Sequence, residues 1–151
     1  RDSWGAVSLV SRYPDEQALS HPDLVLNGLR RTVNRLRSAG LQVVLLRDTP
    51  DIAAELKEYC QLHSPLMKPD CTMPRADFIR QRGLEDQLIR RLLETFPDLV
   101  VVDPIDAFCD RDKCYLMRDG VLYLRDQHHL SLSGAAMVAR LLESHLPLPA
   151  R

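Results

Sequence analysis

Two apolar segments, each directly after a predicted amphipathic helix, constrain the fold more than any other feature of the sequence. Residues 41–46 are almost continuously apolar and follow a helix predicted over 22–39, where Leu and Val recur at spacings of three and four. Residues 99–104, which begin with four apolar residues, repeat this arrangement after a helix predicted over 83–96. Strands that are apolar on both faces are typical of a parallel sheet covered by helices on both sides. The sequence therefore predicts an α/β fold with a mainly parallel sheet.

The remaining predicted elements are shorter and are marked mainly by turn residues. Residues 4–10 predict a first buried strand, and Asp119-Gly120 between two β-prone runs predicts a tight hairpin. The last predicted helix covers 133–146. Residues 51–59 predict a short helix, whereas 60–74 predict a loop because three prolines disfavour a regular element there.

Charge and hydropathy argue against two classes of protein. The 151 residues include 20 basic and 21 acidic ones, with a formal net charge of -1, so nucleic acid is not expected as the main partner. Four arginines of the first helix, Arg30, Arg31, Arg35 and Arg37, are interpreted as a solvated face, because acidic residues elsewhere balance them. No apolar run approaches the length of a membrane span, and no signal peptide is visible. We expect the chain to be a piece of a longer protein.

The four cysteines allow two disulfides, with three possible connectivities. Local pairing, Cys60 with Cys71 and Cys109 with Cys114, is the simplest and would tie down two loops. This pairing indicates an oxidising compartment. The alternative is four free thiols in a cytoplasmic protein. A zinc site is less favoured, because neither spacing forms a Cys-x-x-Cys knuckle, and we expect no metal or cofactor.

A carboxylate and an imidazole three residues apart form the candidate catalytic pair. Asp126 precedes His129 just before the last predicted helix, so its carboxylate can hold the ring of a histidine that acts as a general base. The alternative is an ordinary helix start with a polar cap. His128 is a neighbour that could be mistaken for the base. The other histidines, His21, His63 and His145, are interpreted as surface residues.

Residues 123–135 resemble the last conserved block of the SGNH hydrolase superfamily. The match is to the SGNH domain fused behind membrane-bound O-acyltransferases of bacterial envelopes, where the block reads roughly Tyr-x-Asp-x-x-His-Leu-Ser, two residues, Gly-Ala. The resemblance is specific over 103–138, which includes a Cys-containing loop and a Gly-bearing strand pair, and general before that. One departure is Arg12-Tyr13, where a Trp is more usual in the family.

The resemblance implies a three-layer sandwich with a mainly parallel sheet, of the SGNH-hydrolase or flavodoxin-like kind. Val7, Val44 and Val101 would then lie on neighbouring strands. Residues 1–151 would form the C-terminal part of a single SGNH-like domain, without its first strand–helix unit. An unpaired sheet edge of this kind would favour association.

Carried over to this chain, the family pattern makes His129 the base and Asp126 the acid of a Ser-His-Asp triad. The serine of the family lies in a Gly-Asp-Ser block at the end of the first strand, and this chain has no such block. Ser3 follows an Asp but precedes a predicted strand, so we reject it. The only asparagines, Asn27 and Asn34, lie inside a predicted helix, and neither is assigned to an oxyanion hole.

The resemblance implies transfer or removal of acyl groups, usually acetyl, on hydroxyls of envelope polysaccharide such as lipopolysaccharide O-antigen. The expected partners are this sugar acceptor and an upstream membrane acyltransferase domain, on the periplasmic side of a bacterial inner membrane. The triad serine would lie outside the chain. Two alternatives remain open: a non-catalytic carbohydrate-binding or interaction module with the same fold, and an ordinary cytoplasmic α/β protein with a chance Asp-x-x-His.

We predict that alkylation of the folded chain without reductant modifies no cysteine, because all four are in disulfides. Each bridge closes a short loop and is expected to stabilise the fold by roughly 2 to 3 kcal/mol through the unfolded state. Mass spectrometry before and after reduction measures this directly. Four alkylated thiols in the unreduced protein would contradict the pairing and remove its support for an envelope location.

Overall fold

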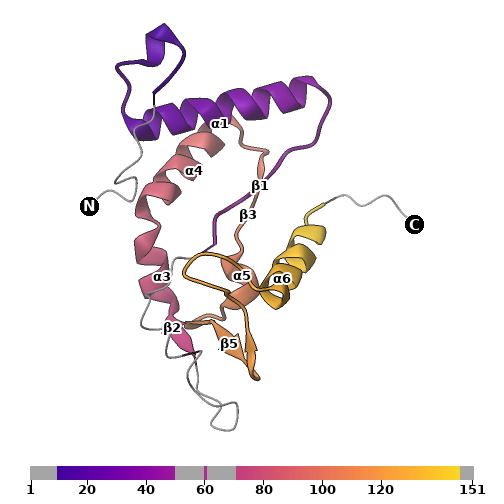
Figure 1. Ribbon diagram of the computed structural model, residues 1–151. Coiled ribbons are helices and arrows are strands. Elements are labelled where there is room, and N and C mark those ends of the chain that lie inside the picture. Colours follow the sequence, from indigo (N-terminus) through magenta and orange to yellow (C-terminus); the bar gives the residue numbers. More distant parts are fainter. Residues whose placement is uncertain (1–9, 50–59, 61–70, 147–151) are drawn as a thin grey trace. The chain divides into compact units, whose positions relative to one another are not determined.

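The computed structural model of the chain describes residues 10–49, 60 and 71–146 (Figure 1). These residues divide into two units. The first unit contains 10–43 and 84–99, and the second contains the rest. The predicted strand at 4–10 lies outside the described residues except for its last residue. The predicted helix at 51–59 lies entirely outside them.

Helices make up the first unit. The 3-10 helix η1 covers Pro14–Glu16, α1 covers His21–Ser38, and α4 covers Gly83–Thr95, with Gly83 itself in the second unit. Ser20 is the N-cap of α1, and its side chain accepts a hydrogen bond from the Asp23 amide at 3.3 Å. Both long helices lie within one or two residues of their predicted bounds, because each combines an apolar periodicity with a clear end.

Specific polar contacts join α1 to the segment 84–99. Arg91 forms an ion pair with Asp23 at 2.8 Å, and Arg37 forms one with Asp98 at 2.9 Å. Each helix also buries two apolar side chains: Leu26 and Val33 of α1, and Leu88 and Leu92 of α4. The first unit thus has an apolar interior with ion pairs at its rim.

The second unit contains the parallel strand pair that the sequence predicts. Strand β1, Val44–Leu46, pairs in parallel with β3, Val100–Val102, and Leu45 lies opposite Val101 (Figure 1). The expectation that Val44 and Val101 lie on neighbouring strands is therefore confirmed, whereas Val7 lies outside the described residues. In the described part of the chain this parallel sheet has two strands, so the three-layer sandwich stays a prediction.

The predicted loop over 60–74 is wrong at its end. Strand β2, Thr72–Pro74, pairs antiparallel with β4, Lys113–Tyr115, and leads into helix α3, Arg75–Gln81. Strand β2 tolerates Pro74 because of its register with β4. Cys71 and Arg75 make the backbone hydrogen bonds at the two ends of this strand pair. In this register Pro74 lies opposite Lys113 as a pair whose backbone groups form no hydrogen bond with each other. Its missing N–H therefore costs no hydrogen bond.

The C-terminal part of the second unit follows the predicted order. After the short helix α5, Ile105–Phe108, which the sequence analysis missed, strands β5, Met117–Arg118, and β6, Val121–Leu122, form an antiparallel hairpin. Its turn residues Asp119 and Gly120 have φ of 51° and 77°, the positive values that a two-residue hairpin turn requires. The predicted hairpin is confirmed. Helix α6, Leu132–Glu143, ends three residues before the predicted bound.

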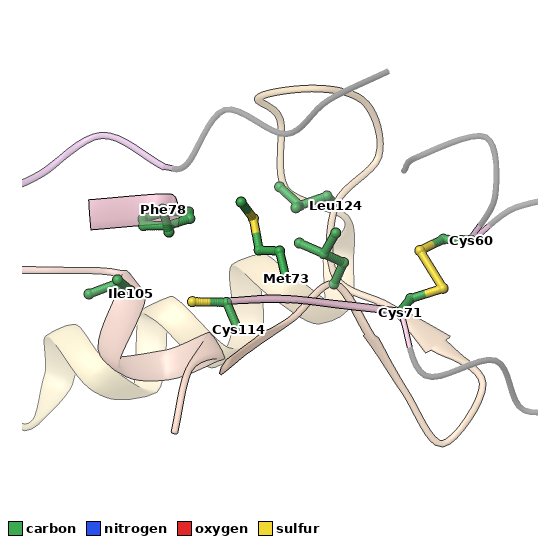
Figure 2. Close-up of a cluster of buried hydrophobic side chains, with 8 residues drawn as sticks. Cys60, Cys71, Met73, Phe78, Ile105, Cys114 and Leu124 are labelled. Atoms are coloured by element: carbon green, nitrogen blue, oxygen red, sulfur yellow. A yellow bond between two sulfur atoms is a disulfide. The ribbon is translucent and has the colours of Figure 1, made fainter. Parts of the chain in front are cut away.

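Both predicted disulfides are present in the second unit. Cys60 is joined to Cys71, and Cys109 is joined to Cys114. Figure 2 shows the Cys60–Cys71 bridge at one end of a buried apolar cluster, with Cys114 in the same cluster. The cysteines therefore act as core residues as well as crosslinks. The cluster consists of Cys60, Cys71, Met73, Phe78, Ile105, Cys114, Leu116 and Leu124.

Asp110 organises the short loop that the Cys109–Cys114 disulfide closes. One of its carboxylate oxygens accepts hydrogen bonds from the Asp112 and Lys113 amides, both at 2.9 Å, and the other accepts one from the Tyr115 hydroxyl at 2.7 Å. The Tyr115 hydroxyl and these two amides lower the pKa of Asp110 to about 2.

We predict that Asp110→Asn lowers the stability of the chain at neutral pH but not in acid. Because folding lowers the pKa of Asp110, its contribution is fully present above about pH 4, the pKa range of an unfolded Asp, and is lost as the pH falls toward 2. Urea unfolding of both proteins at pH 7, pH 4 and pH 2.5 measures the difference. A difference that does not change with pH would contradict the assignment.

Candidate catalytic site

The Asp126 carboxylate holds both the backbone and the ring of His129. Its Oδ1 accepts hydrogen bonds from the His128 amide at 3.1 Å and the His129 amide at 2.9 Å. The Nδ1 atom of His129 lies 2.7 Å from Oδ1 and 2.8 Å from Oδ2 of the same carboxylate. A single side chain therefore sets the turn and the orientation of the imidazole, as the spacing of the two residues predicts.

This arrangement selects one tautomer of the His129 ring. The His128 amide, and with it the amide and ring of His129, holds the pKa of Asp126 well below its usual range, so the carboxylate is ionised and only accepts hydrogen bonds. In the neutral ring Nδ1 must then carry the proton, and Nε2 presents its lone pair. The His129 side chain is 66% exposed, and Nε2 has no hydrogen-bond partner within the described residues. The geometry thus presents a base.

Ser131 fixes the C-terminal side of the turn. Its hydroxyl donates to the Leu122 carbonyl at 2.6 Å and accepts from the Gly134 amide at 3.1 Å, which makes it the N-cap of α6. Its own amide donates to the Tyr123 carbonyl at 2.9 Å. A cap of this kind contributes about 1 kcal/mol. The same serine ties the last helix to β6 through the Leu122 carbonyl.

Gly134 allows α6 to approach the segment after β6. A Cβ atom added at Gly134 would fall on the backbone carbonyl oxygen of Tyr123, far inside contact distance. No other residue fits there without moving the backbone. The Gly in the motif is thus explained by close packing next to the candidate site.

The other side of the turn is held at the carboxyl end of a parallel strand. Thr49, three residues beyond the end of β1, donates its hydroxyl proton to the His128 carbonyl at 2.7 Å. In open α/β sheets, functional crevices lie outside the carboxyl ends of the strands. The candidate pair therefore lies where the fold class predicts a site.

A nearly buried ion network supports the segment that carries Thr49. Asp103, which directly follows β3, accepts hydrogen bonds from Arg82 at 2.7 and 2.8 Å and from Arg47 at 3.1 Å. Arg82 also donates to the Asp48 carbonyl, and its side chain is only 9% exposed. Sequence analysis missed this network. The available signal was the pair of charged residues, Arg47 and Asp103, directly after two apolar strands.

The remaining histidines do not join the candidate pair. The rings of His128 and His129 lie 5.5 Å apart, edge to face. His145 is exposed and its Nδ1 lies 2.9 Å from the Leu141 carbonyl, whereas His21 is partly exposed at the start of α1. His63 lies outside the described residues.

Within the described ranges, no group of three or more His, Cys, Asp or Glu residues could hold a metal ion. No helix in the same part of the chain is long and apolar enough to cross a membrane. The described serines make no hydrogen bond to His129. Ser3, the serine that the sequence analysis rejected, lies outside the described residues.

Fold and site together define an α/β protein with a histidine–carboxylate pair at the carboxyl end of a parallel strand. A family model described as "SGNH domain (fused to AT3 domains)" matches residues 3–144, and the chain belongs to this family. The match reaches well beyond 103–138, where the resemblance of individual residues is specific. Comparisons with curated proteins and with solved structures find no match.

Membership in this family gives the general class of the protein. An SGNH domain implies an α/β hydrolase-like fold and a function related to acyl transfer or ester hydrolysis. Fusion to AT3 domains in the family suggests a membrane protein, and the two disulfides agree with an extracytoplasmic location.

We predict that Thr49→Val loosens the turn that carries His129 without unfolding the domain. Valine has nearly the same shape but cannot donate to the His128 carbonyl, and a neutral hydrogen bond contributes about 1 kcal/mol, or about fivefold in local opening. Hydrogen exchange at the His128 and His129 amides should become about fivefold faster, with exchange in α6 unchanged. Thr49→Ser keeps the hydroxyl and is the control; equal effects of both variants would contradict the anchoring role.

Proposed function

We propose that this chain supplies the acid–base pair of a Ser-His-Asp acyl-transfer centre. His129 is the general base, Asp126 orients its ring and stabilises the imidazolium that forms during the reaction, and the serine lies outside this chain. The observation that carries the proposal is the bond from His129 Nδ1 to both oxygens of Asp126, which leaves Nε2 as the basic nitrogen. Membership in the SGNH family supports it.

The proposed reaction has two half-steps that use the same nitrogen. Nε2 of His129 takes the proton of the serine hydroxyl as its oxygen attacks the acyl carbonyl, and returns that proton to the departing oxygen. An acyl-serine ester remains. Nε2 then takes the proton of an acceptor hydroxyl as the acceptor oxygen attacks the ester. The bond between the acyl group and the serine oxygen breaks, and Nε2 returns the proton to that oxygen, which restores the serine. Transfer results when the acceptor is a sugar, and hydrolysis results when it is water.

Asp126 stays ionised through both half-steps. The amides of His128 and His129 stabilise its negative charge, and that charge stabilises the imidazolium that forms when Nε2 is protonated. The hydrogen bonds from these two amides also fix the carboxylate in place. The carboxylate therefore keeps the ring oriented with Nε2, and not Nδ1, free to act as the base. The turn therefore supplies both the electrostatics and the geometry that a triad histidine needs.

We further propose that the acyl group is acetyl and that the acceptor is a cell-envelope polysaccharide such as lipopolysaccharide O-antigen. Residues 1–151 would be the C-terminal part of a single SGNH domain behind a membrane-bound acyltransferase domain, on the periplasmic side of a bacterial inner membrane. The family description, which names fusion to AT3 domains, supports this arrangement. The two disulfides support an oxidising compartment.

A second candidate function is a non-catalytic carbohydrate-binding or interaction module. The observation that favours it is that no serine in the described ranges bonds to the candidate base. The two functions separate in the full-length parent. A catalytic domain loses acyl transfer when His129 is replaced, whereas a binding module keeps transfer and changes only its affinity for the polysaccharide.

We predict that His129→Ala in the full-length parent abolishes acetyl transfer, because His129 carries the imidazole of this turn that the Asp126 carboxylate orients. Asp126→Asn leaves a misoriented base and should cost roughly a thousandfold or more. His128→Ala is the matched control and should change activity little, because only its backbone amide contacts Asp126. Acetate release and acetylated polysaccharide are measured, with circular dichroism to verify folding.

Two outcomes would overturn parts of this proposal. Loss of activity in His128→Ala with full activity in His129→Ala would show that the wrong histidine was chosen. The isolated chain should not hydrolyse a simple acetyl ester, because it has a base without its serine. If the isolated chain does hydrolyse the ester and His129→Ala stops it, the nucleophile lies within this chain, and Ser3 is the first serine to replace.

A further inference from the structure

The first unit contains a cavity of about 580 Å³ between the segment that precedes α1 and the helix itself. This volume falls within the range of roughly 300 to 1,000 Å³ that is typical of small-molecule sites. We call it the α1 cavity. The lining residues that matter for its chemistry are Arg12, Tyr13, Glu16, Gly28, Arg31 and Arg35.

The only carboxylate of the α1 cavity, within its described lining, is already fully engaged. Glu16 is 5% exposed, and its Oε2 accepts a hydrogen bond from the Ser11 hydroxyl at 2.6 Å. Its Oε1 accepts from Asn27 at 3.2 Å and from the guanidinium of Arg31. Arg31 therefore neutralises Glu16, and neither charge remains for a ligand.

Two further guanidinium groups line the α1 cavity without a carboxylate partner in the described part of the chain. Arg12 donates to the neutral Tyr13 hydroxyl at 3.1 Å, and Arg35 has no carboxylate within ion-pair distance there. Arg37 on the same helix, by contrast, pairs with Asp98. The four arginines of the predicted solvated face thus differ in their partners: Arg31 and Arg37 form ion pairs, Arg30 donates to the Arg91 carbonyl, and Arg35 lines the α1 cavity.

Gly28 gives the α1 cavity part of its open space. It lies in the interior of an 18-residue helix, where glycine is less favourable than any residue except proline. A Cβ atom at this position would have no neighbour within 4 Å, so packing against the protein does not require glycine. A larger side chain at this position would instead occupy the cavity that Gly28 lines.

We propose that the α1 cavity binds a small organic anion, a carboxylate- or phosphate-bearing molecule of about the size of one acidic sugar, through Arg12 and Arg35. Guanidinium groups match carboxylate and phosphate oxygens in planar, two-pronged hydrogen bonds. Arg31, held by Glu16, forms a fixed wall. The proposal is independent of the catalytic function proposed for Asp126 and His129.

Isothermal titration of the full chain with D-glucuronate, glucose 6-phosphate and neutral glucose tests the proposal. Saturable binding of glucuronate assigns a carboxylate ligand, binding of glucose 6-phosphate alone assigns a phosphate, and glucose should not bind. Arg35→Gln should weaken binding by about tenfold or more. Arg140→Gln, which removes an exposed arginine of α6 in the second unit, is the matched control and should leave affinity unchanged.

Gly28→Leu separates binding from folding. Leucine favours helix, so the variant should keep or raise Tm, while its side chain fills the α1 cavity and abolishes anion binding. Three results would each overturn the proposal: no saturable binding of either acid, equal binding of glucose, or unchanged affinity in both Arg35→Gln and Gly28→Leu. None of these results depends on acyl-transfer activity, so they leave the catalytic proposal to its own test.

Discussion

The candidate site depends on one carboxylate that accepts three hydrogen bonds within a four-residue turn. Asp126 binds two consecutive amides and the ring nitrogen of His129. Neither of the two amide hydrogen bonds involves the imidazole itself, so the turn does not depend on the charge of the ring for its shape. The orientation of the ring then follows from the turn and requires no distant residue.

The rest of the second unit fixes this turn from both sides. Ser131 and Gly134 bring α6 against Tyr123, and Thr49 anchors the His128 carbonyl at the carboxyl end of β1. Behind Thr49, two arginines converge on Asp103. Such nearly buried ion pairs add little net stability, because desolvation offsets their attraction. Their effect here is geometric, since Arg82 also holds the Asp48 carbonyl beside Thr49.

The sequence predicted best the features that depend on nearby residues. The bounds of α1 follow from its apolar periodicity and its end signals, and the hairpin follows from Asp119-Gly120, which accept positive φ. The contact of Asp126 with His129 also lies within one turn. The prediction of a loop over 60–74 was wrong at its end because it rested on the number of prolines and did not consider a partner strand. Strand β4 pairs with β2 in a register that places Pro74 where no backbone N–H is needed.

By itself, then, the sequence determined the long helices α1, α4 and α6, the hairpin turn and the pairing of a carboxylate with an imidazole, because each depends on side chains and dihedral angles a few residues apart. Only the tertiary structure decided which distant residues hold the pair. Thr49 and His128 are 79 residues apart, and Arg82 and Asp103 are 21 apart. Contacts of this kind depend on how elements that are far apart in the sequence pack together, as when the parallel pairing of β1 with β3 places Arg47 beside Asp103. No local pattern records that approach.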